Sequence, residues 1–198
     1  MMNYFHLFFF SIFFLNFSGT PSTKATESFA PVEATPVERI ENDEFIPWQV
    51  QRKLSWEDFS GPARTNTEAV ASTSTSLGIA YQLERTGLNY HITCNFSKHK
   101  SWGVLKTDYI LAHEQGHFDI TEIAARRLHQ ALSEYQFNHK TYRKDINQIY
   151  DRIVKEKEDM QAAYDKESDH SRNRRLQYVW LDKIDFMLKE TLPWAEYP

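Results

Sequence analysis

The segment Thr107–Phe137, TDYILAHEQGHFDITEIAARRLHQALSEYQF, has the apolar spacing of a long α-helix. Its apolar residues recur every three or four positions, and Thr107 followed by Asp108 is typical of a helix N-cap and first turn. The residues of this apolar stripe are Ile110, Leu111, Ile120, Ile123, Ala124, Leu128 and Leu132. The segment therefore predicts one long helix, with the motif His113-Glu-x-x-His117 in its first half.

Two further helices are predicted after this segment. Residues 142–164 contain DINQIYDRIVKEKEDMQAAY, and residues 172–188 carry another apolar stripe at helical spacing. The residues of that stripe are Leu176, Val179, Trp180, Ile184 and Met187. The many charges on these segments predict solvent-exposed helix faces rather than a binding patch.

The apolar pattern before the long helix alternates with a period of two, which is typical of β-strands. Two such runs, TSTSLGIAYQL and LNYHITCNF, are separated by the turn sequence ERTG. The residues that share one face are Thr75, Leu77, Ile79 and Tyr81 in the first run, and Tyr90, Ile92, Cys94 and Phe96 in the second. Strands followed by helices predict an α+β fold, with a small, mainly antiparallel sheet followed by a helical half.

Composition excludes several classes of protein and of site. Hydrophobic residues make up 41% of the 198-residue chain, which is enough for the core of one domain. The net charge of -4, from 23 basic and 27 acidic residues, gives no basic field, so no nucleic-acid partner is expected. The single cysteine, Cys94, excludes an internal disulfide, and its alternating surroundings predict a buried strand residue.

The N-terminal region predicts export. Residues 4–17 form an apolar run that is too short to span a bilayer comfortably but fits the apolar region of a secretory signal. Residues 1–18 are therefore predicted to be a signal peptide or a retained N-terminal anchor, followed by a flexible linker over residues 19–45. The domain is expected at residues 46–198, secreted or periplasmic, with membrane contact only if the apolar segment is retained.

The motif His113-Glu114-Gln-Gly-His117 has the arrangement of a zinc hydrolase site. Residues four apart project from the same face of a helix, so both imidazoles are able to reach one Zn2+ ion. Glu114 lies to the side of the pair, where its carboxylate is placed to act as a general base toward a water molecule activated by zinc. Asp119 and Glu122, further along the same helix, are predicted to point away from the pair.

A catalytic zinc ion normally takes a third protein ligand. A histidine six residues after His117 would supply it in one common spacing, but Ile123 occupies that position. His170, at the break between the second and third predicted helices, is one candidate. Glu167 and Asp169 are the carboxylate alternatives nearby.

Three segments of the chain resemble a known bacterial family. They are LSWEDFSG at residues 54–61, KSWGVLKTDYILAHEQGHFDITE at 100–122 and YDKESDHSRNRRLQYVW at 164–180. The family consists of domains of unknown function described as predicted secreted zinc-dependent proteases. The resemblance implies a zincin-like metallopeptidase with the motif on its first long helix, zinc as the cofactor, a peptide or protein as the substrate, and His170 as the third ligand.

The last of these segments matches the family pattern at several positions, which are Tyr164, Asp165, His170, Gln177 and Trp180. Ser168 and Ser171 stand where the pattern has threonine and glycine. Serine keeps the hydroxyl at position 168, whereas the loss of glycine at position 171 alters the turn that presents His170. A zincin also needs a group that stabilises the oxyanion, and Tyr164 is one candidate for it.

Two other functions would use the same residues. A non-catalytic exported module would bind zinc through four protein ligands only to stabilise its fold, and Glu114 would then be replaceable. A ferritin-like di-iron protein would combine Glu114 and His117 with Glu167 and His170, because such sites take a Glu-x-x-His pair from each of two helices. The di-iron alternative leaves His113 without a role, and strands precede the helices, so the peptidase is the favoured hypothesis.

Overall fold

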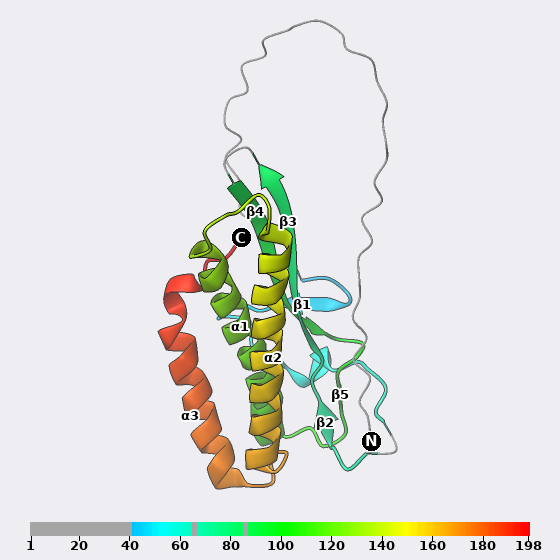
Figure 1. Ribbon diagram of the computed structural model, residues 1–198. Helices are drawn as coiled ribbons and strands as arrows, with labels where there is room; N and C mark the ends of the chain where they lie inside the picture. The colour runs from blue at the N-terminus through cyan, green and yellow to red at the C-terminus, as the bar shows by residue number, and fades with distance from the viewer. Residues whose placement is uncertain (1–40, 65–66, 85–86) are drawn as a thin grey trace, which may run out of the picture. The chain divides into compact units, whose positions relative to one another are not determined.

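The computed structural model describes residues 41–64, 67–84 and 87–198 (Figure 1). The predicted signal peptide or anchor and most of the predicted linker lie outside the described residues. The last linker residues are already tied to the domain, because Glu41 forms ion pairs with Arg52 at 3.2 Å and with Lys98 at 2.7 Å.

A small antiparallel sheet comes first, as predicted. Its order is β1-β4-β3, formed by β1 (Phe45–Pro47), β3 (Thr75–Glu84) and β4 (Gly87–Ser97). A second antiparallel pair joins β2 (Ala71–Ser72) to β5 (Trp102–Gly103). In this order β3 is an edge strand of the larger sheet.

The register of β3 and β4 places the predicted face of each strand against the core. Leu77 pairs with Cys94, and both side chains are buried, so the prediction that Cys94 is a buried strand residue is confirmed. Phe96 of β4 packs against Phe118 of the first helix, with ring centroids 5.9 Å apart. Alternating apolar residues thus join the sheet to the helical half.

Three helices follow, close to the predicted bounds: α1 (Asp108–Ser133), α2 (Tyr142–Ser168) and α3 (Arg174–Glu190). Thr107 is the N-cap of α1, as predicted, and its hydroxyl oxygen accepts a hydrogen bond from the Ile110 N–H at 3.3 Å. Among the residues that the structure describes, no helix has the length and apolar character needed to cross a membrane.

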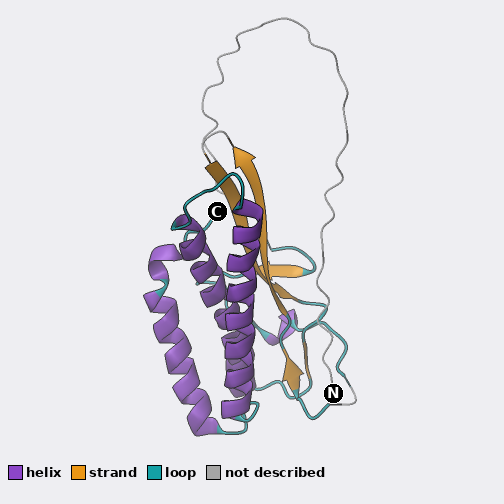
Figure 2. Cartoon of the chain, viewed as in Figure 1, coloured by secondary structure: helices purple, strands orange, loops and turns teal. Residues whose placement is uncertain are grey.

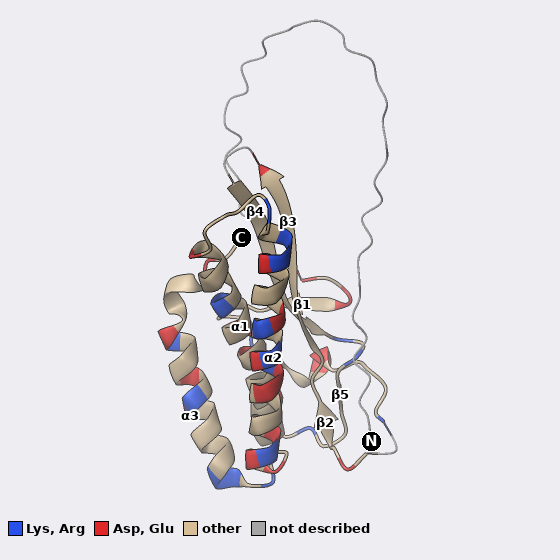
Figure 3. Cartoon of the chain, viewed as in Figure 1, with Lys and Arg blue, Asp and Glu red and all other residues tan. Residues whose placement is uncertain are grey.

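The helices form a layer on one face of the sheet, so the protein is an α+β fold (Figure 2). Two short 3-10 helices, Trp56–Asp58 and Leu192–Trp194, complete the described elements. Lys, Arg, Asp and Glu residues are spread along α2 (Figure 3), and most of them are exposed or half-buried, as expected for a helix with a solvent-exposed face. Because α1 and α2 run antiparallel, the first turns of α1 lie beside the last turns of α2 (Figure 1).

Buried polar contacts fix the rotation of α1 about its axis. Asp119 accepts a hydrogen bond from Trp48 Nε1 at 2.7 Å. Glu122, fully buried, accepts hydrogen bonds from Arg126 Nε at 2.8 Å and from Tyr197 Oη at 2.7 Å. Asp119 and Glu122 therefore point away from the two motif histidines, as predicted, and the histidine face of α1 is turned toward α2.

Candidate metal centre

Three side chains from two helices bring metal-ligating atoms together. His113 and His117 lie one turn apart on α1, and Asp165 lies in the last turn of α2. Asp165 Oδ1 is 3.1 Å from His113 Nε2 and 3.0 Å from His117 Nε2, and the two Nε2 atoms are 3.3 Å apart. These residues form a group able to hold a metal ion.

The spacing of these three atoms fits a small divalent cation. A tetrahedral zinc ion with bonds of about 2.05 Å places its ligand atoms about 3.3 Å from one another. The observed separations of 3.0–3.3 Å are close to that value. Two imidazoles and a carboxylate are also a donor set that zinc accepts, although other first-row divalent metals use the same donors.

Burial and ion pairing shift the protonation of the group in the metal-free protein. Burial lowers the pKa of His117, but the hydrogen bond and negative charge of Asp165 outweigh it and, together with the charge of Glu114 and a hydrogen bond that the imidazole donates to Gln161 Oε1, raise the pKa to about 9. Burial raises the pKa of Asp165, yet the hydrogen bonds from His113 and His117 hold that pKa well below its ordinary range. The carboxylate therefore stays ionised, as a metal ligand must be.

The metal-free protein should lose stability at alkaline pH. The pKa of His117 is about 9 in the folded chain and about 6.5 when unfolded. The pairing of His117 with Asp165 therefore contributes its full stabilisation of the folded chain below about pH 6.5. That contribution is lost as the pH rises toward 9, by on the order of 2–3 kcal/mol. Asp165, whose pKa is lowered, stabilises above about pH 4 and stops doing so in stronger acid.

Urea unfolding of the chelator-treated protein at about pH 6 and about pH 9.5 measures this loss. Asp165→Asn removes the charge of the partner and should make the free energy of unfolding nearly equal at the two pH values. A wild-type protein that is equally stable at both would contradict the pairing of His117 with Asp165.

Glu114, the predicted general base, is buried beside this group. Its side chain is 4% exposed, and Oε2 has no hydrogen-bond partner among the described residues. The carboxylate is close enough to His117 for its charge to raise the pKa of that imidazole. A buried carboxylate oxygen without a hydrogen-bond partner destabilises the fold. Such groups are kept in proteins where they take part in a reaction or bind a water molecule or an ion.

His170, predicted as the third ligand, lies at the edge of the group rather than within it. Its Nδ1 is 3.6 Å from Asp165 Oδ1, and its side chain is 60% exposed. Asp169, His170 and Ser171 all have positive φ angles, of 51°, 49° and 72°. The Tyr109 hydroxyl donates a hydrogen bond to the Ser171 carbonyl at 2.6 Å, which helps hold this turn. The ligand role of His170 stays a prediction.

The two carboxylate alternatives for the third ligand have other partners. Glu167 Oε2 accepts a hydrogen bond from Trp180 Nε1 at 2.8 Å, and Asp169 forms an ion pair with Arg172 at 2.9 Å. Asp165 matches the family pattern, but its position in the sequence does not by itself indicate a metal ligand. The predicted helix ends at residue 164, whereas α2 continues to Ser168. A helix predicted to continue past residue 164 would have included Asp165 and indicated it as a candidate.

Tyr164 lies beneath the two histidines. Its ring centroid is 4.5 Å from that of His113 and 5.0 Å from that of His117. Its hydroxyl donates to the His113 carbonyl at 3.4 Å, and a Cβ added to Gly116 would lie 2.7 Å from the same hydroxyl. Burial raises the pKa of Tyr164 well above its usual range. The contacts thus give Tyr164 and Gly116 a packing role between α1 and α2.

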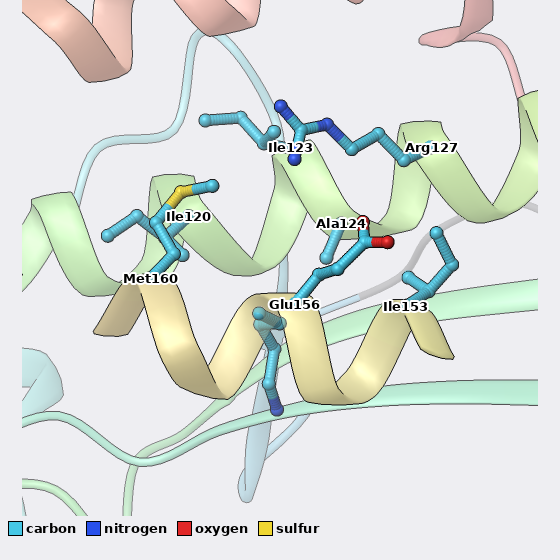
Figure 4. A pocket seen from close by; sticks show the side chains of 8 residues that line it. Ile120, Ile123, Ala124, Arg127, Ile153, Glu156 and Met160 are labelled. Atoms are coloured by element: carbon cyan, nitrogen blue, oxygen red, sulfur yellow. The ribbon is translucent and has the colours of Figure 1, made fainter. Parts of the chain in front are cut away.

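A shallow hollow between α1 and α2 is separate from this group (Figure 4). Its lining residues are Ile120, Ile123, Ala124, Arg127, Ile153, Glu156, Lys157 and Met160. It has no room for a water molecule, and none of its lining side chains belongs to the metal-ligating group. The hollow is best explained as the seam between two packed helices.

One comparison with known proteins gives a match. A family model described as a bacterial protein of unknown function (DUF922) matches residues 28–171, which include Glu114, the three clustered side chains and His170. No curated protein and no solved structure matches the chain. The resemblance to a bacterial family of unknown function is thus confirmed, whereas zinc dependence and protease activity stay predictions.

Proposed function

The chain belongs to the bacterial DUF922 family, whose function is unknown, and we propose that it is an exported zinc-dependent metallopeptidase. The observation that carries this proposal is the convergence of His113 Nε2, His117 Nε2 and Asp165 Oδ1 at 3.0–3.3 Å. Three protein ligands leave a fourth position open, which is the arrangement of a catalytic rather than a structural zinc site. We propose Asp165 as the third ligand, with His170 at the exposed side of the site.

The residues around the ion would divide the work of hydrolysis. A bound zinc ion would supply a Lewis acid that polarises a carbonyl group and makes water acidic near neutral pH. Glu114, on the same helix and buried without a partner for Oε2, would accept the proton of the attacking water and later deliver it to the leaving amine. Tyr164 is turned toward the helix backbone, so we do not propose it as the oxyanion-stabilising group.

A peptide is the substrate class that the surrounding fold favours. β3 is an edge strand, and extended peptides bind to such edges through main-chain hydrogen bonds. The first residue of β3, Thr75, is linked to the backbone of α1 at His117, because its hydroxyl is 2.7 Å from that of Thr121, which in turn donates to the His117 carbonyl at 3.2 Å. A peptide paired with the start of β3 would thus approach the part of α1 that carries His117.

A non-catalytic zinc module is the second candidate. The proximity of His170 to Asp165, at 3.6 Å, favours it, since a small movement of this exposed ring would add a fourth ligand and close the site. The di-iron alternative is less favoured, because Glu167 is bonded to Trp180 rather than directed at His117.

Metal content and peptide hydrolysis test the proposal together. We expect one zinc ion per purified chain by elemental analysis, and cleavage of a mixture of unstructured peptides that stops on chelation and returns with zinc. Zinc without any cleavage would favour the non-catalytic module. Two iron atoms per chain, or no metal after reloading with zinc, would overturn the proposal.

A further inference from the structure

Gln161 of α2 holds the His117 imidazole from the side opposite to the metal group. Its Nε2 donates a hydrogen bond to the His117 carbonyl at 2.8 Å and lies 3.4 Å from Thr121 Oγ1. Its Oε1 is in a short hydrogen bond with His117 Nδ1. Gln161 and Asp165 are four residues apart on α2, so one turn of this helix contacts both nitrogens of the same ring.

These contacts determine which way the amide and the imidazole are oriented. The His117 carbonyl only accepts hydrogen bonds, so the NH2 group of Gln161 must face it. Oε1 is then left facing His117 Nδ1, and because Oε1 also only accepts, Nδ1 must carry the proton. In a neutral imidazole the lone pair is then on Nε2, which faces His113 Nε2 and Asp165 Oδ1.

The two motif histidines differ in the hydrogen bonding of their Nδ1 atoms. His113 Nδ1 is buried and has no hydrogen-bond partner among the described residues. His117 therefore has an orienting partner that His113 lacks in the described part of the chain. A hydrogen bond to the distal nitrogen of a ligand histidine fixes its tautomer and raises its basicity toward the metal.

We infer that Gln161 is a positioning residue for metal binding, which acts by holding His117 with the proton on Nδ1 and the lone pair of Nε2 toward the ion. This role rests on the proposed function, because it requires that His117 be a metal ligand. It assigns a task to a residue that lies outside the His-Glu-x-x-His motif and makes no contact with the metal itself.

Zinc affinity of the full protein, measured by competition with a chromophoric chelator, tests this role. Gln161→Met keeps the length of the side chain but removes both hydrogen bonds, and we expect zinc to bind about 10–100-fold more weakly. Gln161→Glu keeps the acceptor for Nδ1–H and loses only the donor to the His117 carbonyl, so it should bind zinc more tightly than Gln161→Met. Gln148→Met, at an exposed position of the same helix, is the matched control and should leave the affinity unchanged.

A spectroscopic readout separates positioning from a general loss of packing. In the zinc-loaded wild type the His117 Nδ1 proton should give a slowly exchanging NMR resonance, which Gln161→Met should lose while its circular dichroism stays that of the wild type. Equal zinc affinities for Gln161→Met and wild type would overturn the inference and leave the proposed function intact. A wild type that binds no zinc would overturn both.

Discussion

Replacing Asp165 with alanine is expected to lower zinc affinity by more than about 100-fold, because the loss of a direct ligand should exceed the 10–100-fold effect typical of a residue that only supports one. Asp165 Oδ1 is the atom that lies 3.0 and 3.1 Å from the two histidine nitrogens. Without it His113 and His117 would be left as two ligands on one helix. Competition with a chromophoric chelator measures the change.

Two variants sharpen this experiment. Asp159→Ala removes another aspartate from α2, one that is 66% exposed and paired with Lys155, and should bind zinc like the wild type. His170→Ala should weaken binding by less than Asp165→Ala, since His170 lies at the edge of the group. If His170→Ala were instead the more damaging change, the sequence-based choice of His170 as third ligand would be right and the assignment of Asp165 wrong.

Glu114→Gln is expected to reduce peptide hydrolysis by about 10²–10⁴-fold, the usual contribution of a general base, while zinc content stays at the wild-type level. Glutamine has the shape of glutamate but does not accept the proton of the attacking water. The free energy of unfolding should not fall. The substitution puts a neutral amide in place of a buried carboxylate, one of whose oxygens has no hydrogen-bond partner among the described residues. Turnover, metal content and urea unfolding of the same preparation measure the three quantities.

Glu134→Gln is the matched control, because Glu134 follows α1 as its exposed C-cap and lies far along the helix from the histidines. It should keep full activity. Should Glu114→Gln hydrolyse peptides as fast as the wild type, Glu114 would not be the general base. If neither protein cleaved peptides although both held zinc, the non-catalytic module would become the better explanation.

The two long strands and the three helices followed from local patterns. The alternation around Leu77 and Cys94 predicted two strands, and Thr107 with its apolar stripe predicted α1, because a strand or helix buries its apolar residues at its own fixed period. The end of α2 was less clear, since Tyr164 was the last apolar residue of its pattern. The helix instead continues to Ser168, whose hydroxyl bonds back to the Tyr164 carbonyl at 2.7 Å.

The local sequence was sufficient to predict that His113 and His117 lie together in the candidate metal group. His113 and His117 lie on one face of a helix because residues four apart always do, whatever the rest of the chain adopts. The rest of the site depends on the antiparallel packing of α1 against α2, which places Asp165 and Gln161 beside histidines that precede them by 52 and 44 residues. No periodicity encodes that approach; it results from the buried contacts that set the rotation of α1 and turn its histidine face toward α2.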